Sequence, residues 1–141
     1  MTEKDIAFFP VPQHMADLVW PEVSKLLEPA TLTARGKCDI NDLRDGIDNG
    51  TYLLWVVQDG EEIIAGVTTR IITYPQCRAL ALDWIGGRRM KDWIGIVNEQ
   101  MVAHARHNGC SHLEGYGRPS WIRWTRRFGW KEDYVAFKLE V

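Results

Sequence analysis

The run of residues best suited to chemistry is GGRRMK at positions 86–91, between an apolar stretch and a helical pattern. Glycines let a backbone approach a ligand closely, and the first turn of a helix presents N–H groups with a partial positive charge. Such a place favours an anion such as pyrophosphate, and the three basic side chains add full charges. The structural alternative is a tight strand-to-helix turn with solvated basic residues.

A second notable pattern lies later in the chain. Trp121 and Trp124 are interleaved with four arginines, at positions 118, 123, 126 and 127. Stacking aromatics with cationic side chains would suit single-stranded nucleic acid. On a helix, however, positions 121, 124 and 128 share one apolar face, which a short terminal helix must bury while its arginines stay solvated. The spacing therefore favours core packing over nucleic-acid binding.

Charge is unevenly distributed along the 141 residues. Residues 1–70 carry 6 basic and 12 acidic side chains, and residues 71–141 carry 11 basic and 7 acidic ones. A basic second half in a chain of net charge −2 suits one anionic ligand better than a long polyanion. We therefore expect an anion site in the second half and no nucleic-acid partner.

Length and composition predict one globular domain over residues 1–141, because 45% of the residues are hydrophobic and 26% are charged. No stretch approaches the roughly 20 apolar residues of a membrane span, and the start of the chain lacks the features of a signal peptide. We therefore expect a cytoplasmic protein without membrane contact. Cys38, Cys77 and Cys110 form no CxxC pair, so we expect reduced thiols and no metal site.

The apolar periodicity predicts ten elements that could position these residues. In the first half they are a strand at 6–9, a helix from 15 to a stop at Pro29, a helix capped by Asp39 and ended by Gly50, and a hairpin of strands 52–57 and 63–73. Pro21 would either kink the first of these helices or divide it into two. In the second half they are a strand at 78–85, a long helix from 88 to a stop at 108–109, a strand at 112–116, a helix at 119–128 and a strand at 134–141. This order predicts a mixed α/β fold with one crossover helix.

The chain resembles the GNAT superfamily of acyl-CoA-dependent N-acyltransferases over nearly its whole length. The resemblance rests on the element order, the glycine pair at a strand-helix junction, and the ending GRP…RFGW before a final strand. It implies an α/β fold with a mixed, mostly antiparallel sheet of six to seven strands and helices on both faces. The pattern GGRRMKDW…HNGC…GRPSW also resembles a small GNAT-like group encoded by tailed bacteriophages, which would place the protein in the host cytoplasm.

The resemblance implies that the strands at 78–85 and 112–116 splay apart and that acetyl-CoA, the co-substrate, lies between them with its pyrophosphate on the turn. The residues it assigns to binding are Trp84, Ile85, Gly86, Gly87, Arg88, Arg89, Met90, Lys91 and Arg118. Two features depart from the family pattern. The glycines are adjacent, where the family has Arg/Gln-x-x-Gly-x-Gly/Ala, and Thr125 occupies the position of the tyrosine that protonates the leaving thiolate. A threonine hydroxyl is too weak an acid for that role, so Tyr116, Tyr134 or water would supply the proton.

Transfer to an amine also needs a base, because a protonated amine has no lone pair for attack. Asp83 and Glu114 are the carboxylates on the two splayed strands, and His112 is a third candidate. The structural alternatives are that Asp83 bonds the turn backbone and that Glu114 pairs with Arg118 or Arg123. For His104 and His107 the favoured role is a favourable interaction with the end of the long helix.

The leading hypothesis is therefore direct transfer of an acetyl group from acetyl-CoA to an unidentified amine, with Asp83, Glu114 and Tyr116 as the catalytic residues. The first alternative is a GNAT-shaped protein that has lost catalysis and serves as a binding or inhibitory module. The second is a small nucleic-acid-binding protein. Seven tryptophans are many for this length, and the surplus would be consistent with a homodimer contact.

Overall fold

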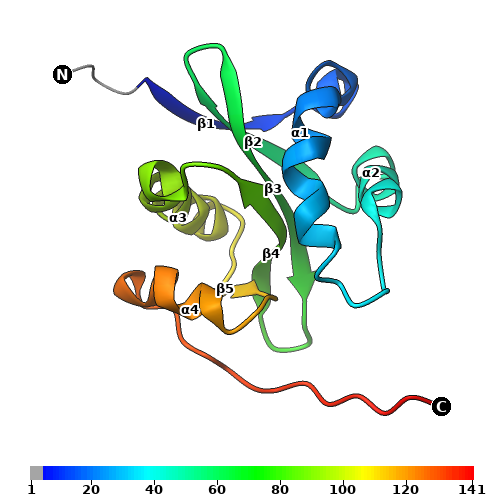
Figure 1. Ribbon diagram of the computed structural model, residues 1–141. Coiled ribbons are helices and arrows are strands. Elements are labelled where there is room, and N and C mark those ends of the chain that lie inside the picture. Colours follow the sequence, from blue (N-terminus) through cyan, green and yellow to red (C-terminus); the bar gives the residue numbers. More distant parts are fainter. Residues whose placement is uncertain (1–4) are drawn as a thin grey trace.

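A computed structural model describes residues 5–141 as one five-stranded sheet between helices (Figure 1). The strands are β1 (Ile6–Val11), β2 (Leu53–Asp59), β3 (Glu62–Thr73), β4 (Arg78–Gly87) and β5 (His112–Gly115). The helices are α1 (Ala16–Thr31), α2 (Ile40–Asp48), α3 (Met90–His107) and α4 (Ser120–Thr125), with 3-10 turns at Gln13–Met15 and Arg126–Phe128. The strands lie in the sheet in chain order. β1 to β4 are antiparallel, and β5 runs parallel to β4 after the crossover through α3, as predicted.

Local side-chain chemistry sets the limits of α2 and of the β2–β3 hairpin. The carboxylate of Asp39 accepts hydrogen bonds from the backbone N–H groups of Asn41 and Asp42 at 2.9 and 3.0 Å, and the Asp42 carboxylate accepts from the Asp39 N–H at 3.0 Å. This reciprocal pair is a capping box. Gly50 after α2 and Gly60 in the hairpin turn have φ of +83° and +61°. The predicted cap and both glycine positions are therefore confirmed.

Two prolines lie inside α1 without ending it. The helix runs uninterrupted from Ala16 to Thr31, so the prediction that Pro29 stops it is wrong, and Pro21 opens no second helix. Both prolines are exposed, whereas Val23 and Leu27 on the opposite side are fully buried. The carbonyl that each proline leaves without a helical donor can therefore bond water. Burial of the apolar side of α1 outweighs the local cost.

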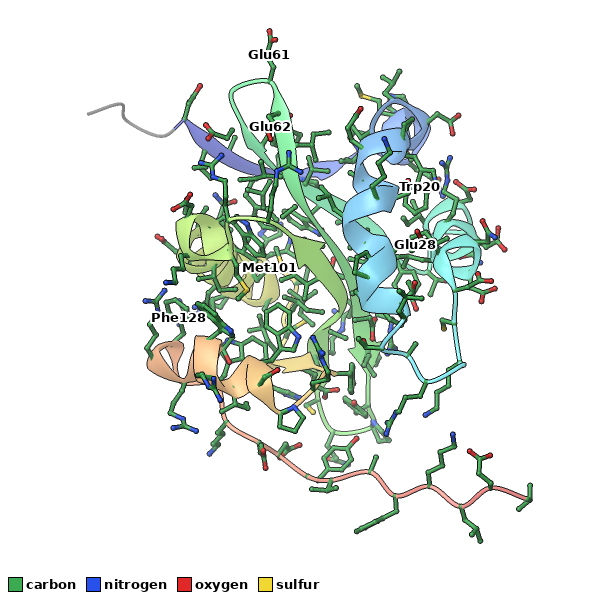
Figure 2. The ribbon with its side chains drawn as sticks, in the orientation of Figure 1. Trp20, Glu28, Glu61, Glu62, Met101 and Phe128 are labelled. Carbon is green, nitrogen blue, oxygen red and sulfur yellow. The ribbon has the colours of Figure 1, made fainter. Side chains whose placement is uncertain are left out.

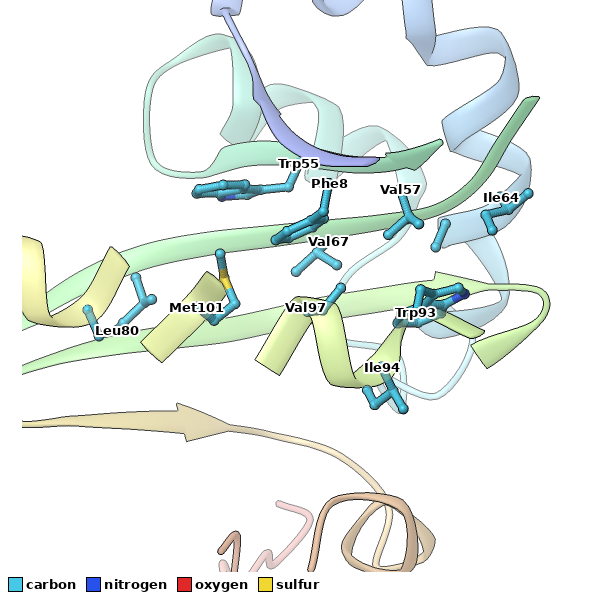
Figure 3. Packing of buried hydrophobic residues seen from close by; sticks show 12 residues of the cluster. Phe8, Trp55, Val57, Ile64, Val67, Leu80, Trp93, Ile94, Val97 and Met101 are labelled. Atoms are coloured by element: carbon cyan, nitrogen blue, oxygen red, sulfur yellow. The ribbon is translucent and has the colours of Figure 1, made fainter. Parts of the chain in front are cut away.

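Helices cover both faces of the sheet, as predicted. The side chains of β2 point alternately to the two faces and show which helices cover each one. Leu54 and Val56 face α1 and α2, whereas Trp55 and Val57 face α3. On the α3 side, Trp93, Val97 and Met101 project from the helix toward the sheet (Figure 3), and Met101 is central in Figure 2. The rings of Phe8 and Trp55 stack there at 5.1 Å, and the sheet is the middle layer of three.

His104 lies in the last turn of α3 and also contacts this core. Its ring meets Trp55 edge-on, with 5.0 Å between ring centroids. Burial lowers the pKa of His104 below the ordinary histidine value of 6.5, and the nearby His107 lowers it further. Its Nε2 lies 3.4 Å from the side-chain nitrogen of Asn108, the residue that caps α3, so His104 lies at the helix end, as predicted. The tertiary contact of His104 with β2 could not be predicted from the sequence of α3 alone.

The C-terminal segment is not a strand of the sheet. Residues 134–141 have the predicted alternation but no strand partner among the described residues, and Phe137 is 94% exposed. In Figure 1 the segment runs past the loop between β3 and β4 to an isolated end. The sheet therefore has five strands, and the expected six to seven is wrong. Alternation of apolar and polar residues indicates that a segment could pair with the edge of a sheet, but it does not show that a free edge lies within reach of that segment.

Candidate functional site

The site is organised by the place where β4 and β5 part, which we call the fork. The two strands pair from Ala79 opposite His112 to Leu82 opposite Gly115. β5 ends there, while β4 continues for five residues to Gly87 with β3 as its only strand partner among residues 5–141. The β4 edge beyond Leu82 therefore has no strand on the β5 side, and its backbone groups on that side lack ladder partners.

A pocket of about 240 Å³ lies beside the unpaired end of β4. Its walls come from the end of β4, the start of α3 and the segment after β5: Gly86, Gly87, Met90, Trp93, Arg118, Ser120, Trp121 and Trp124. Four of these were assigned to acetyl-CoA binding from the sequence, namely Gly86, Gly87, Met90 and Arg118. Trp84, Ile85, Arg88, Arg89 and Lys91 are not part of its lining.

The tryptophans of the pocket are the functional candidates that sequence reasoning missed. Trp121 packs partly against the α3 core, as expected, but Trp124 is 37% exposed and both rings line the pocket. Trp93 is almost fully buried, and its indole N–H donates to the carbonyl of Arg88 at 2.8 Å. The sequence does contain a signal for this pocket, because the three tryptophans lie close in the chain to the glycine pair and to the GRP segment. Only the tertiary fold shows that they converge.

Packing against protein, rather than approach to a ligand, accounts for the two glycines. A Cβ on Gly86 would overlap the carbonyl oxygen of Leu26 in α1. A Cβ on Gly87 would overlap the carbonyl of Ile64 and lie 2.5 Å from the Cβ of Ala65 in β3. Both glycines belong to β4, so the predicted glycine turn is wrong: the strand continues through it. Small residues here let α1 and β3 close on β4.

The two arginines after the glycines are held by acidic residues. Arg88 forms an ion pair with Glu62, and its backbone N–H donates to the Ile64 carbonyl at 2.9 Å. Arg89 adopts a left-handed conformation with φ +62° and pairs with Asp59 at 2.8 Å and with Asp92 at 3.0 Å. Much of their positive charge is therefore balanced within the protein.

A larger hollow of about 460 Å³ lies away from the fork. It is bounded by α1 and the β2–β3 hairpin, and Arg88 is one of its lining residues. Glu61 and Glu62 stand at the hairpin (Figure 2) and line this hollow as well. Since neither the unpaired edge of β4 nor the tryptophans contribute to it, we assign the chemistry to the smaller pocket.

A polar network occupies the sheet face opposite α3, next to the fork. Arg70 and Glu114 both register with Ala81, so they share a face, whereas the neighbouring Leu80 packs toward α3. Each carboxylate oxygen of Glu114 lies 2.9 Å from the Tyr74 hydroxyl, which donates to it. The other partners of this carboxylate are the Tyr116 hydroxyl and Nε2 of His112, the latter at 2.8 Å.

The hydrogen bonds of the network set its protonation states. Desolvation alone would raise the pKa of Glu114, but bonds from Tyr116, His112 and Tyr74 outweigh it and lower that pKa. Burial and the Glu114 charge raise the pKa of Tyr116 well above that of an ordinary phenol. Glu114 is therefore a stable carboxylate and Tyr116 a stable phenol at neutral pH. The alternative that Glu114 pairs with Arg118 or Arg123 is wrong.

Asp83 has a different environment. Its side chain is 10% exposed, and both oxygens accept from Arg70, Oδ2 from Nε at 2.6 Å and Oδ1 from Nη2 at 3.1 Å. A two-point guanidinium contact of this kind is strong and directional. The alternative that Asp83 bonds the turn backbone is therefore wrong, and its carboxylate is occupied by an ion pair to β3.

Two further observations bear on the chemistry. The Thr125 hydroxyl donates to the carbonyl of Trp121 at 2.9 Å, so its proton is used within α4. Within residues 5–141 there is no cluster of three His, Cys, Asp or Glu side chains that could hold a metal ion. No helix in the same range is long and apolar enough to cross a membrane.

No protein-family model matches the chain, and no curated protein matches it by sequence. Solved structures do match it in fold. A probable acetyltransferase aligns with TM-score 0.72 and 12% identity, covering 96% of this chain and 97% of its own. A ribosomal-protein-alanine N-acetyltransferase from Brucella melitensis aligns with TM-score 0.70 and 12% identity, covering 96% and 99%.

An aminoglycoside acetyltransferase from an uncultured soil metagenomic sample, in complex with sisomicin, aligns with TM-score 0.67 and 11% identity over 96% of both chains. At such identities the likeness establishes the fold alone. The chain therefore has the α/β GNAT-like fold, in a form with a five-stranded mixed sheet, and its structural neighbours include acetyltransferases.

Proposed function

We propose that this chain is a single-domain N-acyltransferase that moves an acetyl group from acetyl-CoA to an amine by direct attack. The observation that carries the proposal is the fork, which has an aromatic pocket beside the free end of β4 and the Glu114 network on the sheet face opposite α3. This arrangement offers a thioester and an amine separate routes to one place. The acetyltransferases among the structural neighbours support the same reading.

The lining of the pocket suits acetyl-CoA. Trp121 and Trp124 offer apolar walls, Arg118 offers a positive charge, and the first turn of α3 begins at Met90 in the same lining. The Asp92 amide of that turn donates to the Arg89 carbonyl at 2.8 Å, so the amides before it are the ones that would attract phosphate oxygens. Lys91 in the same turn adds a further positive charge. We expect Arg88 and Arg89 to contribute less, because Glu62, Asp59 and Asp92 balance them.

The unpaired edge of β4 can polarise the thioester. Past Leu82 the strand has no strand partner on the β5 side in the part of the chain that the structure describes, so backbone N–H groups of residues 83–85 that point to that side can donate to the thioester carbonyl. Donors of this kind, fixed where negative charge develops, commonly contribute a few kcal/mol to lowering the barrier. This is the part of the reaction that we assign to Trp84 and Ile85.

In the reaction, the amine nitrogen attacks the carbonyl carbon, the new C–N bond forms, and the C–S bond breaks. The amine loses one proton and the leaving thiolate gains one. We assign the amine proton to Glu114 because one of its partners is the imidazole of His112, which can relay a proton, whereas the partner of Asp83 is Arg70, which cannot. The lowered pKa of Glu114 makes it a weak base alone, but the imidazole of His112 lies 2.8 Å away and can relay the proton.

The thiolate needs a proton from a different group. Thr125 uses its proton within α4, and Tyr134 lies on the exposed C-terminal segment. Tyr116 follows the last residue of β5 at the fork, but its raised pKa makes it a poorer acid than an ordinary phenol. We therefore assign Tyr116 the role of orienting Glu114 and a water molecule, and the water delivers the proton.

A second candidate function is a GNAT-shaped binding module without catalysis. It is favoured by the same features that weaken the enzyme, namely the occupied hydroxyl of Thr125 and the balanced charges of Arg88 and Arg89. Such a protein would bind acetyl-CoA or a partner at the fork but release no thiol.

Measurement of thiol release separates the two functions. The full chain is incubated with acetyl-CoA and a panel of primary amines, including peptide N-termini, lysine side chains and small polyamines. The enzyme predicts amine-dependent release of free coenzyme A above the rate without protein. Saturable acetyl-CoA binding by calorimetry with no release for any amine would instead favour the binding module.

A further inference from the structure

Residues 115–131, which include α4, form a basic segment with five basic side chains and no Asp or Glu. Elsewhere the structure balances arginines with carboxylates, as at Arg44, Arg70, Arg88 and Arg89. In the basic segment, by contrast, the arginines are exposed and form no ion pair with any acidic side chain among residues 5–141: Arg118, Arg123, Arg126 and Arg127. Their positive charge is therefore available to an anionic ligand.

Two of these arginines lie on the side of α4 that forms a wall of the pocket. Ser120 and Trp124 of α4 both line the pocket. Arg123 follows Ser120 by three residues, and Arg127 follows Trp124 by three residues where α4 passes into a 3-10 turn. Residues three apart lie next to each other on one side of a helix. Arg123 and Arg127 therefore border the pocket just outside its lining.

Arg127 is positioned by an aromatic ring. Its guanidinium carbon lies 4.6 Å from the centroid of the Phe128 ring. Phe128 lies just after α4 (Figure 2), and its Cζ is 3.8 Å from the position of a Cβ on Gly95 in α3. A guanidinium stacked on a ring keeps the N–H donors at its edge for a second partner. The stacking therefore orients Arg127 without using its capacity to bind an anion.

The pocket is too small to hold the whole of acetyl-CoA. Pockets that enclose drug-sized ligands usually have about 300–1,000 Å³, whereas this one has about 240 Å³. With the thioester at the fork and the diphosphate at the first turn of α3, the nucleoside end would extend over the neighbouring surface. It could extend toward the hollow beside the β2–β3 hairpin or toward α4.

Charge distinguishes these two directions. The hollow has three acidic and two basic lining side chains, and one of the basic ones, Arg88, already pairs with Glu62. The surface of α4 has only basic charges, and they are unpaired. A phosphate group on the nucleoside would be repelled by the hollow and attracted by α4.

On the basis of the proposed function, we infer that Arg123 and Arg127 bind the phosphate group on the ribose of acetyl-CoA. A phosphate monoester carries a charge of about −1.5 to −2 at neutral pH, and arginines bind such a group through charge-assisted hydrogen bonds. Trp124, which is 37% exposed, offers a ring on which the adenine can stack. The site is therefore selective for acetyl-CoA over acetyl-dephospho-CoA, which lacks only the ribose phosphate.

Calorimetric titration of the full chain with each of these two thioesters tests the selectivity. The titrations are done at low ionic strength, where exposed charges are least screened. We expect acetyl-CoA to bind at least about tenfold more tightly than acetyl-dephospho-CoA, because only acetyl-CoA can form the charge-assisted hydrogen bonds to the two arginines.

A double variant, Arg123→Gln with Arg127→Gln, should lose about tenfold in affinity for acetyl-CoA and keep its affinity for acetyl-dephospho-CoA. The ratio of the two affinities should then be about one. Arg106→Gln is the matched control, because Arg106 is an exposed arginine without an ion pair among residues 5–141 but lies in the last turn of α3, eleven residues or about 16 Å beyond Gly95. This variant should keep the wild-type ratio.

Equal affinity of the unmodified chain for the two thioesters, or a double variant that keeps the wild-type ratio, would overturn the phosphate site and leave the proposed function standing. If neither thioester binds, the proposed function and the phosphate site both fail. Selective binding with no thiol release for any amine would support the phosphate site and identify the binding module. The substituted arginines are exposed, so the variants should fold, and thermal unfolding verifies this.

Discussion

Two carboxylates lie beside the fork, and their hydrogen-bond partners separate their roles. Asp83 is fixed by a guanidinium that takes both of its oxygens, whereas Glu114 is held by two phenols and an imidazole. The ion pair to Arg70 joins β4 to β3, and a guanidinium stays protonated, so it cannot pass a proton on. A histidine-linked carboxylate can receive a proton and pass it on.

Glu114→Gln should lower kcat/KM for amine acetylation by about 100-fold or more, since general-base catalysis contributes that much. Acetyl-CoA affinity, measured by calorimetry, should stay unchanged, because Glu114 lies outside the pocket lining. Glu61→Gln at the hairpin is the control and should keep full activity. Wild-type turnover by Glu114→Gln would remove Glu114 from the mechanism.

Asp83→Asn should act on stability. It leaves the Arg70 guanidinium beside a neutral amide in a site where Asp83 is 10% exposed, so we expect a loss of about 1–3 kcal/mol in the free energy of unfolding. Urea denaturation measures it. Asp17→Asn breaks the pair between Arg44 and a carboxylate that is 85% exposed and should cost under about 1 kcal/mol. Equal losses for the two variants would contradict the assigned role of Asp83.

His104 should make stability depend on pH in a defined direction. Burial lowers its pKa below 6.5 in the folded state, so the unfolded chain takes up the proton first as pH falls. The His104 contribution is therefore present above pH 6.5 and is lost as pH falls toward the folded pKa. Denaturation curves from pH 7.5 to 5 should show this slope, and His104→Gln should reduce it. An NMR titration midpoint at or above 6.5 for His104 in the folded protein would refute the assignment.

At the scale of elements, the junction of β4 with α3 depends on the two glycines. The sequence marks them as special because adjacent glycines interrupt an apolar run. Gly86 is required by a contact with α1, some 60 positions earlier in the chain, and Gly87 by a contact with β3. A local sequence pattern indicates that the backbone needs space at a position, but it does not indicate which neighbouring element requires that space. The same limit applies to His104, whose partner lies on β2.

Gly86→Ala should therefore destabilise the fold by about 1–3 kcal/mol, because the new methyl group would overlap the Leu26 carbonyl and α1 would have to shift. Gly95→Ala in α3 is the matched control: the nearest atom to its Cβ would be Cζ of Phe128, at 3.8 Å. That change should be neutral or stabilising by up to about 1 kcal/mol. Thermal or urea unfolding of both variants decides the matter, and a harmless Gly86→Ala would disprove the packing explanation.

Most elements could be predicted from the sequence because each has a local cause, such as the Asp39 cap or the positive φ of Gly60. The continuation of α1 through Pro21 could not, since burial of Val23 and Leu27 against the sheet decides it. The aromatic pocket was missed for the same reason. Trp121 and Trp124 follow a core-like spacing, and only the position of α4 beside the β4 end turns them toward a pocket.

At the scale of the whole molecule, the charge asymmetry has a partly internal explanation. The acidic first half supplies Asp59 and Glu62, which bind Arg89 and Arg88 of the basic second half. The excess of basic residues after position 70 therefore serves in part to join the two halves of the chain around the sheet. The positive charge that remains at the pocket comes from Arg118, with the start of α3 beside it.

The central claim is that the pocket beside the fork binds acetyl-CoA, and a crystal structure grown with that compound tests it most directly. We predict density for the thioester between the β4 end and the rings of Trp121 and Trp124, with the acetyl group at the fork and phosphates near Arg118 and the first turn of α3. A pocket filled by the side chain of Met90, or density in the hollow beside Glu61 and Glu62 instead, would contradict the claim.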